Sequence, residues 1–178
     1  MASTNVETFA AELKVPADVL LEQLKAAGVD KSSAGDPLSE AERAAVFAEA
    51  RNLLGVPWRH KGRTERGVDC LGLLWLPLSR VRPVVRPADD YGRLPHNKRL
   101  RAELTAWLGE PVPLDRADVV TMRWGPKGEE HHVGYVVSHP FHPRGLIECA
   151  SSECGGGRVV EHGIDAMWQA RLIEGWAL

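Results

Sequence analysis

Apolar positions in the first third of the chain follow the period of amphipathic helices. The segments "NVETFAAEL" and "VPADVLLEQLKAAGV" predict two helices, and Gly28 ends the second of them. After the loop "DKSSAGDP", a longer helix is predicted in "PLSEAERAAVFAEARNLLG", where Ser39 and Glu42 have the spacing of a capping box. The pattern therefore indicates a small, all-helical unit at the start of the chain.

From Ala48 onward the pattern changes, because Trp, Pro and Gly become frequent and strand-like segments appear. These segments are "ADVVTMRW", "HHVGYVVS", "GLIECAS" and "GRVVEHG", and a helix is predicted before them in "NKRLRAELTAWLG". Helices followed by an antiparallel sheet predict an α+β fold. The helix over about 38–54 belongs to both pieces in this interpretation, so we expect no linker between them.

Composition and charge narrow the class of protein. The 178 residues carry 24 acidic and 22 basic side chains, a net charge of -2 that gives no sign of a nucleic-acid partner. Three cysteines do not suggest a disulfide framework and fit a reducing compartment. The polar start "MASTNVETFAAELKV" resembles no export signal, so we expect synthesis in the cytoplasm. The longest apolar run, "CLGLLWLPL", is shorter than the about 20 residues that span a bilayer, so no membrane insertion is expected.

Cys70 is the first candidate for chemistry, because it stands at the head of an apolar run in "RGVDCLGLLWLPL". One interpretation is a buried core thiol, since free cysteine is among the most buried residue types. The other is a nucleophile at a helix N-terminus, where the amide dipoles favour the thiolate. Asp69 lies directly before it, and a carboxylate there opposes ionisation of the thiol.

A histidine and a carboxylate are candidates to complete a site with Cys70. His131 and His132 begin a predicted strand on opposite faces, so one of them can face the sulfur. Glu148 lies on the next predicted strand between apolar neighbours, where its carboxylate can accept the ring N–H of His132. The sequence does not determine the register of the two strands, and the contact stays a hypothesis.

Several of these segments resemble the NlpC-type cell-wall cysteine peptidases, most closely the phage-encoded branch. They are "AEARNLLGVPWRHKGRTERGVDCLGLL", "DYGRLPH", "VPLDRADVVTMRW", "HHVGYVV", "GLIECA" and "GRVVEHGIDAMWQARL", which cover about residues 46–178. The resemblance implies a papain-like α+β fold and cleavage of peptidoglycan stem peptides between D-glutamate and a diamino acid, with no cofactor. It also implies that Cys70 is the nucleophile and His132 the base.

Two residues depart from the family pattern. Glu148 stands where the family usually has a histidine, and it keeps an acceptor for the imidazole. Trp58 stands in place of the usual tyrosine, whose hydroxyl is thought to help stabilise the oxyanion. We take Trp58 and Asp69 as candidates for contact with the substrate or the oxyanion. A non-catalytic module that binds the cell wall or a protein partner is the alternative function.

The first piece resembles a different family. The stretch "VETFAAELKVPADVLLEQLKAAGVDKSSAGDPLSEAER" is similar to the small N-terminal domain of bacterial translation initiation factor two. That resemblance implies a helical accessory module without catalytic residues, whose protein partner is unknown. The predicted domains are therefore 1–46 and 47–178, with a shared helix, and the sequence leaves open whether the fusion is natural.

Two further interpretations concern metal and anion binding. The residues His139, His142, Cys149 and Cys154 suggest a zinc site, but no Cys-x-x-Cys pair is present and we expect no metal. The stretch "RVRPVVRP" holds three arginines, which we interpret as a solvated loop rather than an anion site: Arg80, Arg82 and Arg86.

Overall fold

The computed structural model describes residues 38–87, 89–92, 99–123, 130–151 and 156–178. The helices among these residues are α3 (Glu40–Asn52), α4 (Cys70–Val81), α5 (Arg99–Leu108), the 3₁₀ turn η1 (Leu114–Arg116) and α6 (Ala166–Gln169). The strands are β1 (Arg63–Thr64), β2 (Gly67–Val68), β3 (Val119–Met122), β4 (His132–Val137), β5 (Gly145–Cys149), β6 (Val159–Gly163) and β7 (Leu172–Trp176). The two helices predicted before residue 38 lie outside the described residues, as does Cys154.

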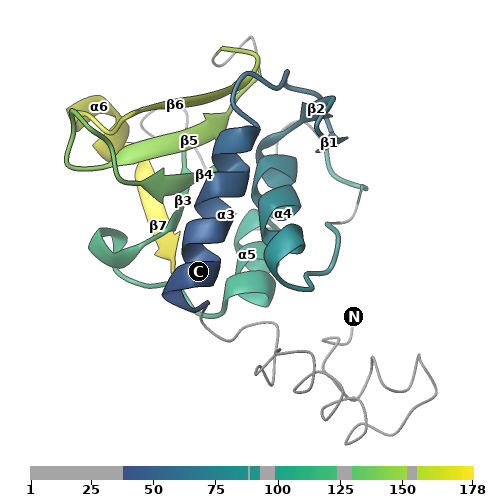
Figure 1. The fold of residues 1–178 in the computed structure, drawn as a ribbon, viewed down its shortest axis with the longest axis horizontal. Helices are drawn as coiled ribbons and strands as arrows, with labels where there is room; N and C mark the ends of the chain where they lie inside the picture. Colours follow the sequence, from purple (N-terminus) through teal and green to yellow (C-terminus); the bar gives the residue numbers. More distant parts are fainter. Residues whose placement is uncertain (1–37, 88, 93–98, 124–129, 152–155) are drawn as a thin grey trace, which may run out of the picture.

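A five-stranded antiparallel sheet, in the order β6-β5-β4-β3-β7, forms the centre of the protein. Helices α3, α4 and α5 lie together beside the sheet (Figure 1), and the main apolar core fills the space between them and the strands. Alternate residues of β4 point to opposite faces, so Tyr135 enters this core while Val136 joins a smaller cluster on the other face. Helices on one side of an antiparallel sheet confirm the predicted α+β fold.

Helix α3 begins with the predicted capping box. The Ser39 hydroxyl accepts the Glu42 N–H at 3.3 Å, and the Glu42 carboxylate accepts the Ser39 N–H at 2.8 Å. The buried side chains of Val46 and Ala50 pack this helix into the main core beside α4. The helix that the sequence assigns to both pieces is therefore part of the body of this fold.

Helix α4 is held inside the molecule along most of its length. Leu71, Leu73, Leu74 and Leu78 are all buried against the sheet and α3. The hydroxyl of Tyr135 on β4 donates a 2.6 Å hydrogen bond to the Leu74 carbonyl, which ties the helix to the centre of the sheet. The position of its first residue is thereby fixed relative to β4.

Some elements were not predicted from the sequence pattern. Strands β1 and β2 have two residues each, too short for a period to be recognised. Strand β7 has a half-buried middle with buried ends, which gives no clean alternation. These strands are recognised only by their backbone pairing: β1 pairs with β2, and β7 pairs with β3, both antiparallel.

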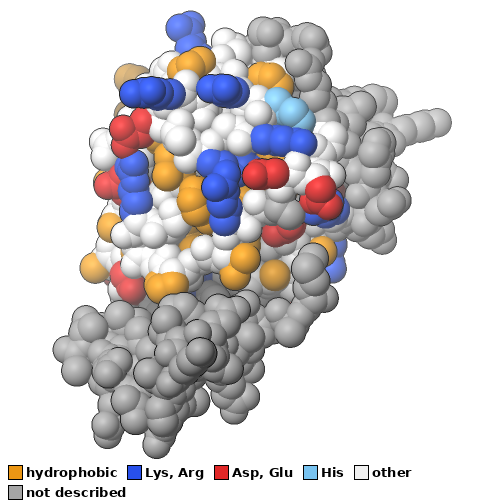
Figure 2. Space-filling view, turned by 90° about the vertical axis from the view of Figure 1, so that its right-hand side faces the viewer, with side chains coloured by type: hydrophobic (Ala, Val, Ile, Leu, Met, Phe, Trp, Pro, Cys, Tyr) orange, Lys and Arg blue, Asp and Glu red, His pale blue; other side chains and the backbone are white. Residues whose placement is uncertain are grey.

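The interpretation of "RVRPVVRP" as a solvated loop is wrong for two of its three arginines. Arg80 lies in the last turn of α4 and bridges Glu49 and Glu65 with N–O distances of 2.5 Å. Arg82 is buried and donates to the Trp107 carbonyl, near the end of α5, at 2.6 Å. On the face shown in Figure 2, basic and acidic side chains are interspersed. None of the helices in the described part of the chain is both long and apolar enough to cross a bilayer.

Candidate active site

Cys70 is the first residue of α4 and is half-buried. Strand β2 delivers the chain to this point, and the segment before it pairs with β2 through the bond from the Arg59 N–H to the Val68 carbonyl, 2.8 Å. Asp69 is the N-cap, so the sulfur sits where the helix dipole favours a negative charge. This placement differs from that of Cys149, which is buried inside the core on β5.

His132 opens β4 and is buried between Cys70 and Glu148. Its Nε2 lies 2.9 Å from the Glu148 carboxylate, and the imidazole also forms a side-chain hydrogen bond with Cys70. Since Nε2 is occupied by Glu148, Nδ1 is the nitrogen left for the sulfur. The structure thus brings together the three residues for which the sequence suggested a common site.

The register of β4 and β5 explains the contact between His132 and Glu148. Gly134 pairs directly with Glu148, which places that carboxylate diagonally across from His132 on the same face. A Cβ atom at position 134 would lie 2.7 Å from the Ile147 carbonyl oxygen and 3.3 Å from the Glu148 Cβ. Glycine therefore permits the close approach of β5 that carries the carboxylate to the ring.

The pKa of His132 is raised to about 9 in this environment. Burial alone would lower the pKa, but the hydrogen bonds to Cys70 and Glu148 and the negative charges of these groups outweigh it. The imidazolium is thus favoured at neutral pH, which suits a thiolate–imidazolium pair. Burial, followed by the nearby negative groups, raises the pKa of the Cys149 thiol instead, and this thiol stays protonated.

Asp69 is buried and its carboxylate accepts four hydrogen bonds from the protein. The donors are the Lys61 N–H at 2.8 Å, an Arg63 Nη1–H at 2.6 Å, the Gly72 N–H at 2.8 Å and the Tyr91 hydroxyl at 2.5 Å. Through its bond from the Gly72 N–H, Asp69 caps the N-terminus of α4. A carboxylate also has no hydrogen to donate to an oxyanion. Its contact with a substrate stays a prediction.

Trp58 is half-buried against the main core, in the segment that pairs with β2. Its ring stacks on His60 with centroids 6.2 Å apart, and His60 meets the Tyr91 ring edge-on at 5.6 Å. The predicted contact of Trp58 with the oxyanion is not tested by this geometry. Arg63 and Tyr91, which reach Asp69, were missed from the sequence because no motif links their positions to it.

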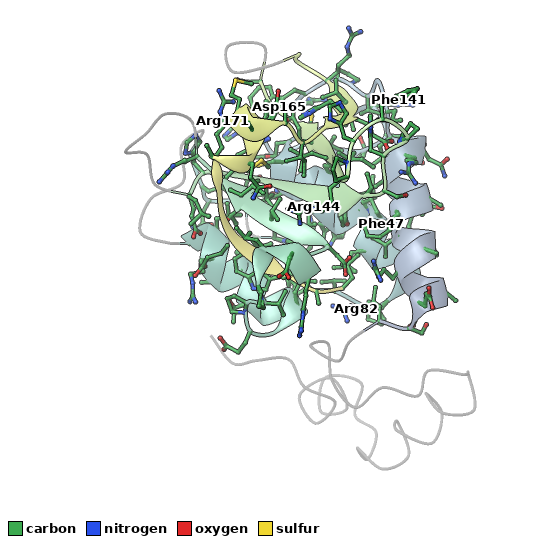
Figure 3. The ribbon with its side chains drawn as sticks, turned by 90° about the vertical axis from the view of Figure 1, so that its left-hand side faces the viewer. Phe47, Arg82, Phe141, Arg144, Asp165 and Arg171 are labelled. Atoms are coloured by element: carbon green, nitrogen blue, oxygen red, sulfur yellow. The ribbon has the colours of Figure 1, made fainter. Side chains whose placement is uncertain are left out.

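The proposed zinc ligands do not form a cluster among the described residues. No group of three or more His, Cys, Asp or Glu side chains in this part of the chain is placed to hold a metal ion. The Cys149 thiol donates to the Val68 carbonyl at 3.5 Å, while the rings of His139 and His142 lie tilted at 58° with centroids 5.1 Å apart in the turn after β4. The same turn carries Phe141, which points away from the molecule (Figure 3).

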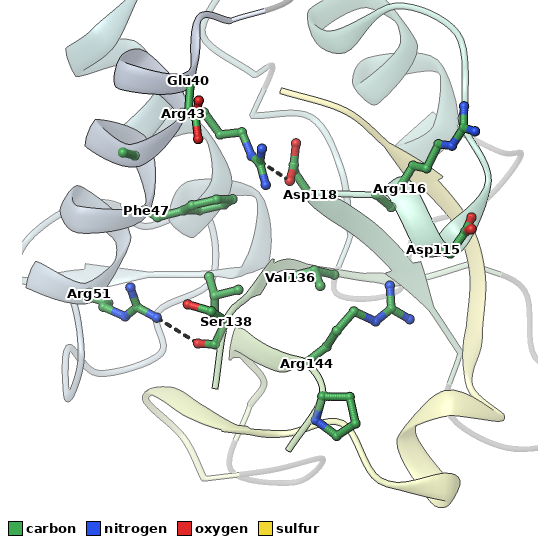
Figure 4. A pocket seen from close by; sticks show the side chains of 14 residues that line it. Glu40, Arg43, Phe47, Arg51, Asp115, Arg116, Asp118, Val136, Ser138 and Arg144 are labelled. Carbon is green, nitrogen blue, oxygen red and sulfur yellow. Dashed lines mark hydrogen bonds and ion pairs between the residues drawn. The ribbon is translucent and has the colours of Figure 1, made fainter. Parts of the chain in front are cut away.

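A groove of about 590 Å³ lies at the other end of β4. It is bounded by α3, the η1 turn and the turn after β4, and its walls include Phe47, Val136 and Arg144 (Figure 4). The Arg43 guanidinium binds the Asp118 carboxylate at 2.9 Å across one side. His132 opens β4 and the groove adjoins the last residues of that strand, so the groove is separate from the Cys70 site.

Comparison with known proteins supports both resemblances. Residues 1–51 match the family described as "Translation initiation factor IF-2, N-terminal region", which confirms that resemblance and reaches into α3. The fold is similar to the NlpC/p60 domain of the peptidoglycan hydrolase SagA, with TM-score 0.51, 18% identity, and coverage of 76% of this chain and 98% of that domain. It is also similar to the peptidoglycan hydrolase RipB from Mycobacterium tuberculosis, with TM-score 0.50, 18% identity, and coverage of 99% and 86%. The predicted papain-like fold of the NlpC type is confirmed.

Proposed function

We propose that this protein is a cysteine peptidase that hydrolyses amide bonds in the stem peptides of peptidoglycan. The observation that carries the proposal is the hydrogen-bonded series of Cys70, His132 and Glu148 at the start of α4. The fold shared with two peptidoglycan hydrolases supports the choice of substrate. The bond between D-glutamate and a diamino acid rests on the resemblance of the motifs in residues 46–178.

The reaction begins from the Cys70 thiolate and the His132 imidazolium. The sulfur attacks the carbonyl carbon, and the carbon–nitrogen bond breaks as His132 gives its proton to the departing amine. A thioester to Cys70 remains. His132, now neutral, takes a proton from a water molecule, whose oxygen attacks the thioester. The carbon–sulfur bond breaks, the carboxylic acid is released, and the Cys70 thiolate is restored beside the His132 imidazolium. No cofactor takes part in these steps.

Glu148 acts on this reaction through His132. It accepts the Nε2–H, which keeps Nδ1 directed at the sulfur, and its charge stabilises the imidazolium. Trp58 is proposed as a donor to the oxyanion through its indole N–H. Glu148 is thus a positioning residue, whereas Cys70 and His132 touch the reacting atoms.

The region that matches initiation factor two has an accessory function in this proposal. Residues 1–46 bind a protein partner or support folding, and residues 47–178 carry the chemistry. We further propose that the protein is made in the cytoplasm and reaches the cell wall on lysis or by phage-type delivery.

The proposal is tested by incubating the full chain with purified tripeptide and tetrapeptide stem peptides and analysing the products by mass spectrometry. We expect a pair of products from cleavage between D-glutamate and the diamino acid. Cys70→Ser, which keeps the size of the side chain, is the matched inactive control. Intact stem peptides after prolonged incubation of a folded protein with a reactive Cys70 would overturn the substrate and favour a binding module.

A further inference from the structure

A cluster of two buried charged side chains and one half-buried tyrosine lies directly behind the candidate nucleophile. It consists of Arg63 on β1, Asp69 at the N-cap of α4, and Tyr91 in the loop after α4. We propose that Arg63 and Tyr91 are positioning residues of the Cys70 site, which fix and neutralise the Asp69 carboxylate so that the neighbouring thiol can ionise. The catalytic meaning of this assignment rests on the proposed function, but its effect on the thiol does not.

The contacts within the cluster form a closed ring. Arg63 Nη1 binds one Asp69 oxygen at 2.6 Å, Arg63 Nη2 donates to the Tyr91 hydroxyl, and that hydroxyl donates to the other Asp69 oxygen at 2.5 Å. Arg63 Nη1 also donates to the Gly62 carbonyl at 2.7 Å. The carboxylate is therefore held from both oxygens and cannot rotate toward the sulfur without breaking charged hydrogen bonds.

Burial makes the charge of Arg63 effective at short range. The Arg63 and Asp69 side chains are 3% and 5% exposed, so little water screens their interaction. An isolated carboxylate at position 69 would repel a thiolate at position 70, and it would also be costly to bury without a partner. The guanidinium removes both problems, because the pair as a whole is neutral.

The protonation states that the cluster needs are stable over the physiological range. Burial alone would lower the pKa of Arg63, but the charge of Asp69 and the bond to Tyr91 outweigh it and raise the pKa. Burial, and then the hydrogen bond to Asp69, raise the pKa of the Tyr91 hydroxyl above its usual value. Tyr91 therefore stays protonated and keeps donating to Asp69.

Two glycines allow the guanidinium to reach the helix. A Cβ atom at position 72 would lie 2.0 Å from the Gly62 carbonyl oxygen and 3.0 Å from Arg63 Nη1. A Cβ atom at position 62 would lie 2.4 Å from the Gly67 carbonyl oxygen. The chain before β1 is thus packed on the first turn of α4 at a distance that only glycine permits.

The other titratable and charged groups around Cys70 belong to elements other than β1. His132 on β4 and Glu148 on β5 face the sulfur side, and the Cys149 thiol on β5 is near enough to be affected by the charges of Cys70 and Asp69. The Lys61 ammonium lies over the Tyr91 ring at 5.7 Å from its centroid, and His60 packs against the same ring. A change at Arg63 therefore alters chiefly the charge balance at Asp69.

The direct measurement is the pH dependence of the alkylation of Cys70 by iodoacetamide, followed by peptide mass spectrometry so that other cysteines do not contribute. In Arg63→Met we expect the midpoint to rise by about one pH unit, which is about a ten-fold slower alkylation below the midpoint. Arg63→Lys restores the charge and should recover most of the loss. Tyr91→Phe should give a smaller shift in the same direction. Arg66→Met changes an exposed arginine just before β2 and is the matched control, with no shift expected.

A double variant shows whether Arg63 acts through Asp69. With Asp69→Asn in the background, Arg63→Met should no longer move the midpoint, because no negative charge is left to neutralise. An unchanged midpoint in folded Arg63→Met, or an equal shift in the Asp69→Asn background, would overturn the proposal. If Arg63→Met does not fold, Tyr91→Phe decides: a midpoint equal to that of the unchanged protein overturns the proposal. A protein that cleaves no stem peptide but shows these shifts would refute the proposed function alone.

Discussion

The two ends of β4 carry the same kind of ion pair in two different settings. Near the start of the strand, Arg63 and Asp69 pair behind Cys70 with side chains 3% and 5% exposed. Near its end, Arg43 and Asp118 pair across the groove with side chains 48% and 10% exposed. Water screens the second pair and hardly reaches the first. The N–O distances of the two pairs are similar, 2.6 and 2.9 Å, so the burial of an arginine–aspartate pair, and not its distance, determines how strongly it acts on a neighbouring group.

The largest effect should come from removing the nucleophile at the catalytic end. Cys70→Ala is expected to lower turnover of stem peptides by at least about 10⁴-fold while the protein stays folded, since Ala fits the start of a helix. Ser138→Ala at the groove end, where Ser138 offers its backbone carbonyl to Arg51, should leave turnover unchanged. Turnover is measured by mass spectrometry of products and folding by circular dichroism. Equal turnover in Cys70→Ala and the unchanged protein would show that Cys70 is not the nucleophile and that the start of β4 is not the catalytic end.

Stability should separate the two ion pairs next. Arg63→Met leaves a carboxylate buried without its cation and is expected to lower the free energy of unfolding by about 3–5 kcal/mol. Arg43→Met breaks the screened pair and should cost about 0–1 kcal/mol. Urea unfolding of both variants gives the two values. Similar losses in the two variants would show that burial does not distinguish these pairs.

The carboxylate that orients His132 should have an intermediate effect on turnover. Glu148→Gln keeps an acceptor and removes the charge, and should lower turnover about ten-fold, while Glu148→Ala should lower it by up to about a thousand-fold. KM should hardly change, because Glu148 acts through His132. Glu161→Gln is the matched control, since Glu161 binds Arg51 at 2.9 Å on the groove side. Full turnover in Glu148→Ala would leave a Cys70–His132 dyad without a third member.

The smallest expected effect is the fall of activity at high pH. His132 must be protonated to give its proton to the departing amine, and its pKa is raised to about 9. Activity should therefore decrease as the pH rises through about 9, and this limb of the profile should move to lower pH in Glu148→Gln. A profile of kcat/KM against pH measures both. Arg43→Met should leave the profile unmoved, because its pair lies at the groove end.

The sequence predicted the elements whose signals are local. The capping box of Ser39 and Glu42 was visible as a spacing, and so was the position of Cys70 at the head of an apolar helix. The contact of His132 with Glu148 depends on a strand register that the pattern on each strand does not contain. The motif resemblance named both residues, but only the register brings them together.

The cluster behind Cys70 could not be found from the sequence for a related reason. Arg63 lies 6 positions and Tyr91 22 positions from Asp69, and no single helix or strand spans either separation. Their contact depends on the folded path of β1 before α4 and of the loop after α4. Arginine and tyrosine are ordinary surface residues by composition, and only the structure shows that Arg63 is buried and that both side chains bind Asp69.

Helix α3 is a rigid part of the fold that holds Cys70. Its 13 residues form a continuous rod of about 20 Å, and its inner side chains are locked into the main core. A protein partner that binds the chain before Ser39 would therefore be connected, through the rigid helix α3, to the folded part that holds Cys70. Bending inside α3 would pull Val46 and Ala50 out of the core, so α3 moves together with the body that holds Cys70.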